Sequence, residues 1–269
     1  MKDNNSPTLQ LSTENLVAGY DKTVIKEINL TIEVGKMNIL VGSNGCGKST
    51  LLKCLARVLP PFSGQVLLNG DNIHRLPSKK VAQKMALLPQ GPIAPEGLSV
   101  KELVAQGRYP HQSFLKQWSK ADEAAVNDAM KMANIEALAD HNLSDLSGGQ
   151  RQRCWIAMVL AQQTDIILLD EPTTFLDLKV QVDLLDLLSE MAHKNKRTMV
   201  IVLHELNLAA AYADNLIMMK AGQIYQQGKP LDIFTRENLQ AVFDLSANVI
   251  KDADTGALVC IPTIKRHSA

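Results

Sequence analysis

The residues best suited to chemistry begin with a glycine-rich stretch at positions 42–50. Gly42, Gly47, Lys48 and Ser49 fit the phosphate-binding pattern G-x-x-x-x-G-K-[ST]. Glycines let backbone N–H groups curl around an anion, because no Cβ blocks positive φ or close approach. The lysine ammonium supplies a cation for the terminal phosphates, and the serine hydroxyl is a ligand that Mg²⁺ accepts. The stretch therefore indicates a nucleotide-binding protein.

The sequence on both sides of this stretch supplies the elements that the motif needs. The apolar run 37–41 predicts a buried strand, and 50–56 predicts an amphipathic helix whose start adds the positive end of a dipole. This strand–loop–helix context makes a chance glycine-rich turn the weaker alternative. We expect the nucleotide to contact the whole loop: Gly42, Ser43, Asn44, Gly45, Cys46, Gly47, Lys48, Ser49 and Thr50.

Polar side chains of catalytic type follow two further apolar strands. The run 166–169 ends in Asp170 and Glu171, and the run 199–203 ends in His204. In an open parallel sheet, ligands bind beyond the carboxyl ends of the strands, where the phosphate loop also begins. Gln90 follows a short strand at 86–88 and can join the group. We therefore expect these four side chains to face the same terminal phosphate.

Each of these side chains has a chemical role that suits its type. Asp170, together with Ser49 and the amide oxygen of Gln90, can ligate Mg²⁺. Glu171 can polarise a water for in-line attack, and His204 can hydrogen-bond the terminal phosphate or that water. Alone, a carboxylate after a strand is often a cap and a single histidine is more often structural, so the prediction depends on their joint placement.

A second glycine pair lies at the predicted start of the helix 151–162. Ser147 and Gln150 fit a capping box, S-x-x-Q. Gly148 and Gly149 each cost about 1 kcal/mol of helix propensity, and an ordinary cap does not need them. Bare backbone at a positive helix end is what a phosphate can approach. An ordinary cap and a second anion site therefore both remain open at these four residues.

The chain between these motifs divides into three kinds of segment. Alternating residues at 9–17 and 24–32 predict antiparallel strands, and the block 91–163 is helical in character, with a capping box at Ser119. A long amphipathic helix is predicted at 178–193 and a hairpin at 217–225. After residue 231, a short helical tail and a last strand at 257–262 are expected, with no feature that indicates a function.

Composition limits the class of protein. With 269 residues, 46% of them hydrophobic, the chain can form one large α/β domain or a domain plus a subdomain. The 28 basic residues balance the 28 acidic ones, which disfavours nucleic acid as a partner. No signal peptide and no membrane span are expected, so a membrane would be reached through a partner. The four cysteines show no paired spacing and are expected to be free thiols in a reducing cytosol. We expect the Cys46 thiol to react with thiol reagents unless the nucleotide is bound.

Taken together, the motifs resemble those of the nucleotide-binding subunits of ATP-binding cassette (ABC) transporters, over residues 9–225. The resemblance assigns a family role to each stretch: Walker A is 42–50, the signature sequence is 146–150, Walker B is 166–170, and the D-loop is 173–177, which ends in Asp177. It also assigns roles to four single residues: Tyr20 stacks on adenine, Gln90 is the Q-loop glutamine, Glu171 is the catalytic glutamate and His204 is the switch histidine. Phe175 departs from the small residue more often found in the D-loop.

The resemblance implies an α/β P-loop NTPase fold of ABC type. Its mixed-sheet core (1–90 and 164–269) carries an antiparallel β-subdomain, and an α-helical subdomain (91–163) is inserted. It implies ATP and Mg²⁺ as cofactors, with Glu171, His204 and Gln90 as catalytic residues. It also implies a head-to-tail homodimer, in which Ser147, Gly148, Gly149 and Gln150 of one copy cap ATP held by the other.

The implied partners beyond this dimer are integral membrane permease subunits and, through them, an extracytoplasmic substrate-binding protein. The subunit would therefore work at the cytoplasmic face of the cell membrane. No nucleic acid is implied.

The transported compound is suggested by three stretches, 107–112, 151–158 and 172–178, which resemble ATPases of ferric-siderophore importers. Importers of vitamin B12 or haem are close alternatives, because selectivity lies in the permease and the binding protein. A soluble ABC ATPase acting on ribosomes or DNA is disfavoured by the single cassette and the balanced charge. A nucleotide-gated module without turnover is disfavoured by the presence of Glu171 and His204.

Overall fold

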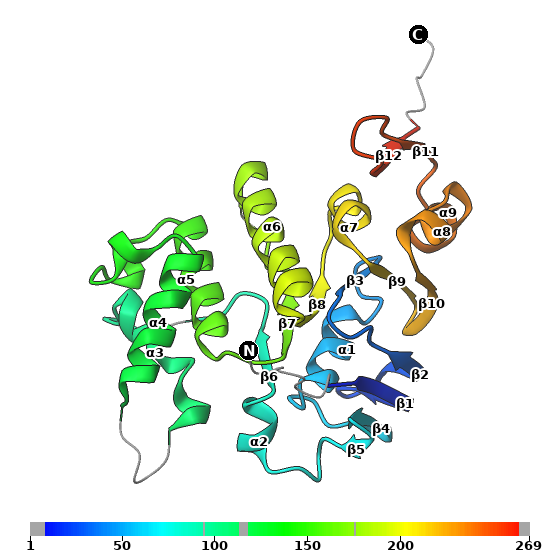
Figure 1. The fold of residues 1–269 in the computed structure, drawn as a ribbon. Helices are drawn as coiled ribbons and strands as arrows, with labels where there is room; N and C mark the ends of the chain where they lie inside the picture. Colours follow the sequence, from blue (N-terminus) through cyan, green and yellow to red (C-terminus); the bar gives the residue numbers. More distant parts are fainter. Residues whose placement is uncertain (1–8, 94, 113–117, 175, 264–269) are drawn as a thin grey trace, which may run out of the picture.

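The computed structural model describes residues 9–93, 95–112, 118–174 and 176–263. Its centre is a six-stranded sheet in the order β10-β9-β3-β8-β7-β6 (Figure 1). All neighbouring pairs are parallel except β9 and β10, which form a hairpin. The strands are β3 (Met37–Gly42), β6 (Met85–Leu88), β7 (Ile166–Asp170), β8 (Thr198–Val202), β9 (Asn215–Lys220) and β10 (Gln223–Gly228). The carboxyl ends of β3, β6, β7 and β8 therefore meet at one edge, where the predicted catalytic residues follow.

A second, antiparallel sheet in the order β2-β1-β4-β5 packs beside the first. It consists of β1 (Leu11–Gly19), β2 (Thr23–Thr31), β4 (Ser63–Leu68) and β5 (Asp71–Asn72). Helix α1 (Lys48–Leu55) shares one hydrophobic core with this sheet and with one face of the central sheet. This core fixes the start of α1, and hence the phosphate loop, against β3.

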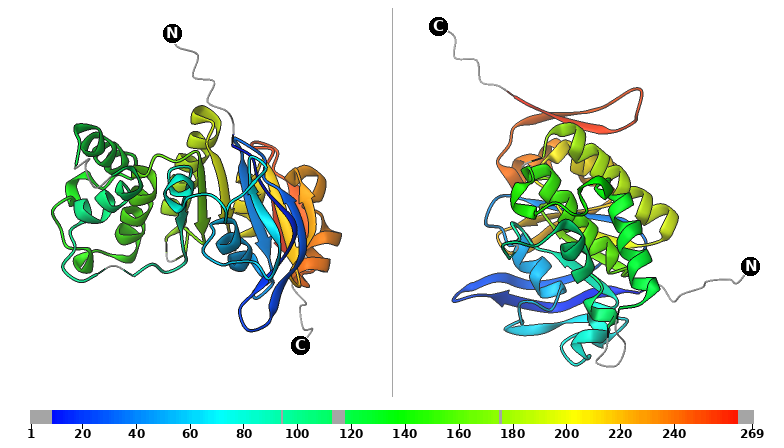
Figure 2. Two further views of the ribbon diagram at one scale, coloured as in Figure 1. Left: turned by 90° about the horizontal axis from the view of Figure 1, so that it is seen from below. Right: turned by 90° about the vertical axis from the view of Figure 1, so that its left-hand side faces the viewer.

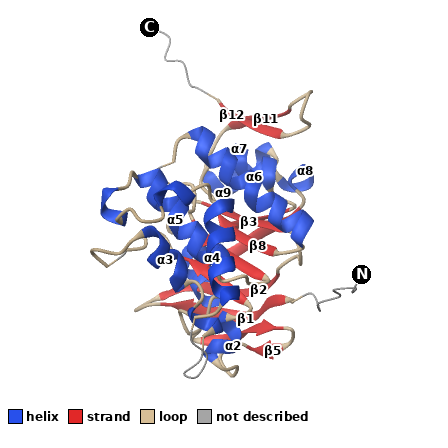
Figure 3. Cartoon of the chain, turned by 60° about the vertical axis from the view of Figure 1, so that its left-hand side comes forward, coloured by secondary structure: helices blue, strands red, loops and turns tan. Residues whose placement is uncertain are grey.

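The other face of the central sheet shares a larger core with most of the remaining helices. Figure 3 shows β3 and β8 between α6 and α7 on one side and the antiparallel strands on the other. These helices are α3 (Val100–Gln106), α4 (Lys120–Met132), α5 (Gly148–Ala161), α6 (Leu178–Asn195), α7 (Leu206–Tyr212), α8 (Pro230–Ile233) and α9 (Arg236–Phe243). Three short 3₁₀ turns at Tyr109–His111, Glu136–Leu138 and Leu143–Asp145 connect them. Helix α2 (Ser78–Ala82) instead joins the core of α1 through Val81.

Helices α3, α4 and α5 form a group that stands to one side of both sheets (Figure 2). Capping boxes at Ser99, Ser119 and Ser147 begin all three, which confirms the two that the sequence predicts. A buried ion pair joins them, because Arg108 Nε donates to Asp122 Oδ1 at 2.9 Å and the same guanidinium donates to Ala161 O at 2.7 Å. The group corresponds to the predicted helical insertion, whose exact limits as a subdomain stay a prediction.

The predicted elements of the core are confirmed, with small shifts at their ends. The antiparallel strands, the strands before the catalytic residues and the long helix α6 all form. The helix predicted at 151–162 begins three residues earlier, at Gly148, because its capping residue is Ser147. Helices α2 and α7 were not predicted from the sequence, and neither was β11 (Ala247–Lys251), which pairs with β12 (Leu258–Pro262). Within the described residues, no helix combines the length and apolar character needed to cross a membrane.

Candidate active site

The phosphate loop joins β3 to α1, and its shape leaves the start of the helix open. Gly47, the residue before α1, has φ 108°, a conformation that side-chain-bearing residues rarely adopt, and no side chain caps the helix. The first N–H groups of α1 are therefore directed at a ligand site. Lys48 Nζ donates to Gly42 O at 2.8 Å and to Ser43 O at 3.3 Å, so the ammonium is folded back over the loop.

Ser49 and Asp170 meet at the edge of the sheet, as the sequence predicts. Ser49 Oγ donates to Asp170 Oδ1 at 2.9 Å, although the two residues are 121 positions apart. Asp170 is buried at the end of β7, and burial raises the pKa of its carboxyl, while the bond from Ser49 opposes that shift. The pair presents hard oxygen atoms of the kind that Mg²⁺ binds together with phosphate oxygens. The residues present therefore fit a Mg²⁺ site.

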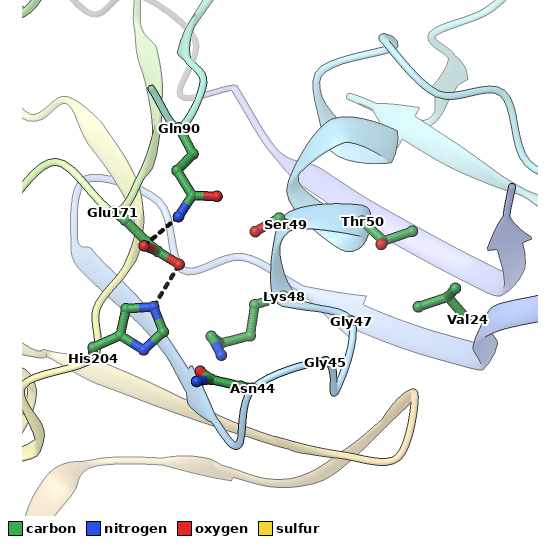
Figure 4. A pocket seen from close by; sticks show the side chains of 10 residues that line it. All are labelled: Val24, Asn44, Gly45, Gly47, Lys48, Ser49, Thr50, Gln90, Glu171 and His204. Atoms are coloured by element: carbon green, nitrogen blue, oxygen red, sulfur yellow. Dashed lines mark hydrogen bonds and ion pairs between the residues drawn. The ribbon is translucent and has the colours of Figure 1, made fainter. Parts of the chain in front are cut away.

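Glu171 lies at the centre of a three-residue cluster. Its carboxylate accepts a hydrogen bond from Gln90 Nε2 at 2.6 Å and is also paired with His204 Nε2 (Figure 4). Its backbone is left-handed, at φ 54°, so the chain turns sharply after Asp170. The turn explains why neighbouring carboxylates have different partners: Asp170 faces Ser49, and Glu171 faces Gln90 and His204.

A cavity of about 560 Å³ separates this cluster from the phosphate loop. In Figure 4, Gln90, Glu171 and His204 lie on one side and the loop residues on the other. The lining consists of Val24, Asn44, Gly45, Gly47, Lys48, Ser49, Thr50, Gln90, Glu171 and His204. Nine of these ten were predicted, and Val24 was missed because an aliphatic residue in a strand carries no chemical signal. The structure thus assembles the predicted catalytic residues around one cavity.

Cys46 belongs to the loop but not to the lining. The residue is only 4% exposed and lies in the core shared with the antiparallel sheet. Burial raises the pKa of its thiol, more than the nearby Lys48 lowers it. The structure therefore argues against the predicted thiol reactivity, and only the backbone of Cys46 can serve the loop. Gly42 and Ser43 likewise shape the loop from outside the lining, through the carbonyls that hold Lys48.

Tyr20 lies in the turn between β1 and β2, four residues before Val24 of the lining. Its ring is 54% exposed, with Lys53 Nζ 5.8 Å from the ring centroid. Lys53 Nζ also donates to Tyr20 Oη at 3.2 Å. The ring is thus available at the surface beyond the cavity, and its stacking on adenine stays a prediction.

The second predicted anion site does not line the cavity. Ser147 and Gln150 form the expected capping box, and Gly148 faces open space, with no atom within 4 Å of where a Cβ would lie. Asp177 caps α6 instead, accepting from Val180 N at 3.0 Å. Within one chain, 147–150 and Asp177 therefore stay apart from the phosphate loop. Phe175, the unusual residue of the predicted D-loop, lies outside the described residues.

Comparisons with known sequences give relatives over most of the chain. A family model described as "ABC transporter" matches residues 25–174. A "Probable siderophore transport system ATP-binding protein" of Bacillus subtilis (strain 168) is 54% identical over 253 residues, covering 94% of this chain and 92% of the relative. The ferric enterobactin transport ATP-binding protein of Escherichia coli (strain K12) is 47% identical over 255 residues and covers 94% of each chain.

Solved structures share the fold of this chain. A chain from a structure described as an inward-facing metal-chelate type ABC transporter has TM-score 0.82 and 30% identity, with 96% of this chain and 98% of that chain covered. A dimeric ATP-binding cassette in a post-hydrolysis state, bound to ADP and Pi, has TM-score 0.74 and 27% identity, with coverage of 82% and 98%.

Proposed function

Since this chain belongs to the ABC transporter family and is an ATPase of that family, we propose that it powers import of an iron(III)–siderophore or a related metal chelate. The observation that carries the catalytic part is the placement of Glu171, held by Gln90 and His204, across a cavity from the phosphate loop. A carboxylate fixed opposite a phosphate cradle suits the activation of a water for in-line attack.

Each step of the proposed ATP hydrolysis has a residue whose chemistry suits it. The N–H groups at the start of α1 and the ammonium of Lys48 bind the phosphates of ATP. The water oxygen bonds to the terminal phosphorus and gives a proton to Glu171, while the bond from that phosphorus to the bridging oxygen breaks and ADP leaves with that oxygen. Gln90 and His204 orient the Glu171 carboxylate, and His204 can turn its Nε2 to the phosphate. Ser49 and Asp170, with Gln90, would hold Mg²⁺, which supplies positive charge against the phosphate oxygens when bound.

The proposed working unit is a head-to-tail homodimer. Gly148 is open at the start of α5, with its N–H groups at a positive helix end, and 147–150 lie apart from the loop of their own chain. The dimeric cassette bound to ADP and Pi supports the same assembly by similarity.

The proposed cargo rests on the relatives. Their names specify ferric enterobactin, petrobactin and iron(3+)-hydroxamate, all of which are iron chelates. We propose permease subunits as the membrane partner, an extracytoplasmic binding protein as the indirect one, and the cytoplasmic face of the membrane as the place of action.

Glu171→Gln tests the catalytic assignment. We expect ATP hydrolysis to fall by ~10²-fold or more, with ATP binding retained, because the amide cannot accept the proton. Glu205→Gln is the matched control, since Glu205 bonds Thr173 and does not line the cavity. If Glu171→Gln hydrolysed ATP at the wild-type rate, the assignment of Glu171 as the group that accepts the proton would be wrong.

Reconstitution with the co-purified permease in liposomes tests the cargo. We expect ATP-dependent uptake of radioactive iron supplied as a catecholate or hydroxamate siderophore. Uptake of cobalamin or haem in its place would refute the iron-siderophore proposal and leave the ATPase assignment intact.

A further inference from the structure

The C-terminal hairpin of β11 and β12 lies directly against α7, the helix that follows His204 (Figure 1). The face of the hairpin toward the body of the protein carries Ala247 and Cys260, which are buried, and Val249 and Leu258, which are half-buried. All four belong to or pack against the core that includes Ala209 and Ala210 of α7. The last described strand of the chain thus supports an element next to the candidate active site.

One side chain joins the hairpin to the first turn of this helix. Asn207 Oδ1 accepts a hydrogen bond from Cys260 N at 2.8 Å, and Asn207 Nδ2 donates to Cys260 O at 3.4 Å. The amide therefore binds both backbone groups of one residue in β12. Asn207 is the second residue of α7 and lies three positions after His204.

Helix α7 depends on such contacts for its position. It has seven residues, and its capping residue, Glu205, makes no side-chain capping bond. A helix this short has little stability of its own and is placed by tertiary packing. At its far end, Tyr212 Oη donates to Asp186 Oδ1 of α6 at 2.7 Å. Near the start of the helix, beside His204, Glu205 accepts a long hydrogen bond of 3.4 Å from Thr173 Oγ1, and Asn207 makes the bonds to the hairpin.

The backbone of His204 lies between two supports. On one side, Leu203 N donates to Leu40 O at 3.2 Å and continues β8. On the other side is the first turn of α7. The His204 side chain itself is 39% exposed and pairs with Glu171, so its position depends on these two backbone supports. A shift of α7 would move Nε2 relative to the Glu171 carboxylate.

We propose that the C-terminal hairpin is a positioning element for ATP hydrolysis, which acts through Asn207 and α7 on His204. Asn207 is its positioning residue: it does not line the cavity, and its side-chain hydrogen bonds are those with Cys260. The inference rests on the proposed ATPase function, and it gives a role to the chain after residue 231, for which the sequence alone indicates none.

Steady-state ATP hydrolysis of the purified full-length chain tests the proposal with three variants. In Asn207→Ala we expect kcat to fall between about threefold and tenfold, well short of the ~10²-fold loss of an acid–base group, with KM within about twofold of wild type. Asn207→Asp keeps the acceptor for Cys260 N–H and should retain kcat within about twofold. Asn238→Ala is the matched control, because Asn238 Nδ2 also donates to a backbone carbonyl, Ile233 O at 2.7 Å, but away from α7.

Hydrogen exchange separates positioning from a general loss of stability. Both alanine variants should lower Tm by about 2–4 °C, whereas only Asn207→Ala should speed amide exchange at 206–212. The proposal would be overturned if Asn207→Ala kept the wild-type kcat, or if kcat fell equally in Asn238→Ala. Neither result would affect the ATPase activity of the wild-type chain. A wild-type chain that hydrolyses no ATP would overturn the proposed function, and this inference with it.

Discussion

At the scale of single residues, the chemically active groups of the site are paired with protein atoms. Lys48 donates to two loop carbonyls, Ser49 to Asp170, and Glu171 is held by Gln90 and His204. A nucleotide that enters the cavity replaces these hydrogen bonds with bonds to its own phosphates. The net binding free energy gained per hydrogen bond is therefore modest. The pairs also keep the side chains near their working positions, which lowers the cost of ordering them on binding.

The cysteines give a prediction at this scale. All four (Cys46, Cys54, Cys154 and Cys260) are free and buried. Burial raises the pKa of each thiol, to about 12 for Cys54 and about 11 for Cys154, and the thiolate is the reactive form. We expect an aromatic disulfide reagent at pH 8 to detect almost no thiol in the native protein and four after denaturation. A fast-reacting thiol that ATP protects would contradict the buried position of Cys46.

A second residue-scale prediction concerns acid stability. The Ser119 hydroxyl and then the Arg108 guanidinium hold the pKa of Asp122 at about 2, against 3.8 for an ordinary aspartate. Because the folded-state pKa is the lower one, the contribution of about 2 kcal/mol is complete above pH 4 and is lost as the pH falls toward 2. The difference in unfolding free energy between wild type and Asp122→Asn should therefore shrink between pH 4 and pH 2 in urea titrations. A difference in unfolding free energy that stayed constant over this pH range would contradict the lowered pKa of Asp122.

At the scale of elements, burial decided what could be predicted. The strands β3, β7 and β8 are entirely buried and appear in the sequence as unbroken apolar runs that end in polar residues, which also predicted the site. Helices α2 and α7 are five and seven residues long, too short for a helical period to be evident. Strand β11 alternates only weakly, since most of it is exposed. Tertiary contacts, not local pattern, place these three.

The ion pair that joins α3, α4 and α5 gives the prediction for this scale. Arg108 and Asp122 have side chains 6% and 7% exposed, so removing the cation leaves a buried carboxylate without its partner. We expect Arg108→Met to lower the unfolding free energy by about 3–5 kcal/mol. Lys84→Met is the control, because Lys84 pairs with Asp165 in an exposed bridge that contributes less than about 1 kcal/mol. An equal loss of unfolding free energy in the two variants, measured by chemical denaturation, would show that the buried ion pair contributes no more than the exposed one.

At the scale of the whole molecule, the two predicted phosphate-binding stretches belong to different parts of the fold. The loop at 42–50 lies against the sheets, and 147–150 begin a helix of the group that stands aside. Sequence motifs indicated both stretches but not their separation, which depends on how α3, α4 and α5 pack. A complete site therefore needs a second chain in the proposed assembly.

Gly148→Ala tests this assembly. The Cβ meets no atom within 4 Å, and alanine has the higher helix propensity, so the variant should be at least as stable as wild type. If the bare backbone receives a phosphate from the other copy, the methyl group should weaken that contact. In the Glu171→Gln background, we expect ATP to shift wild-type Gly148 protein to twice its mass in light scattering, and the alanine variant much less. An equal shift in both would show that the glycine has no role in dimer formation.

The left-handed backbone of Glu171 has a consequence for how this chain can change. An ordinary residue at φ 54° costs about 1–2 kcal/mol relative to glycine, which adopts that conformation without strain. Glycine or asparagine there would relax the turn after β7, yet would remove the carboxylate that faces the phosphate loop. Under the proposed catalytic role of Glu171, selection for thermal stability alone would therefore favour inactive proteins at this position, and selection for turnover would keep the strained residue in place.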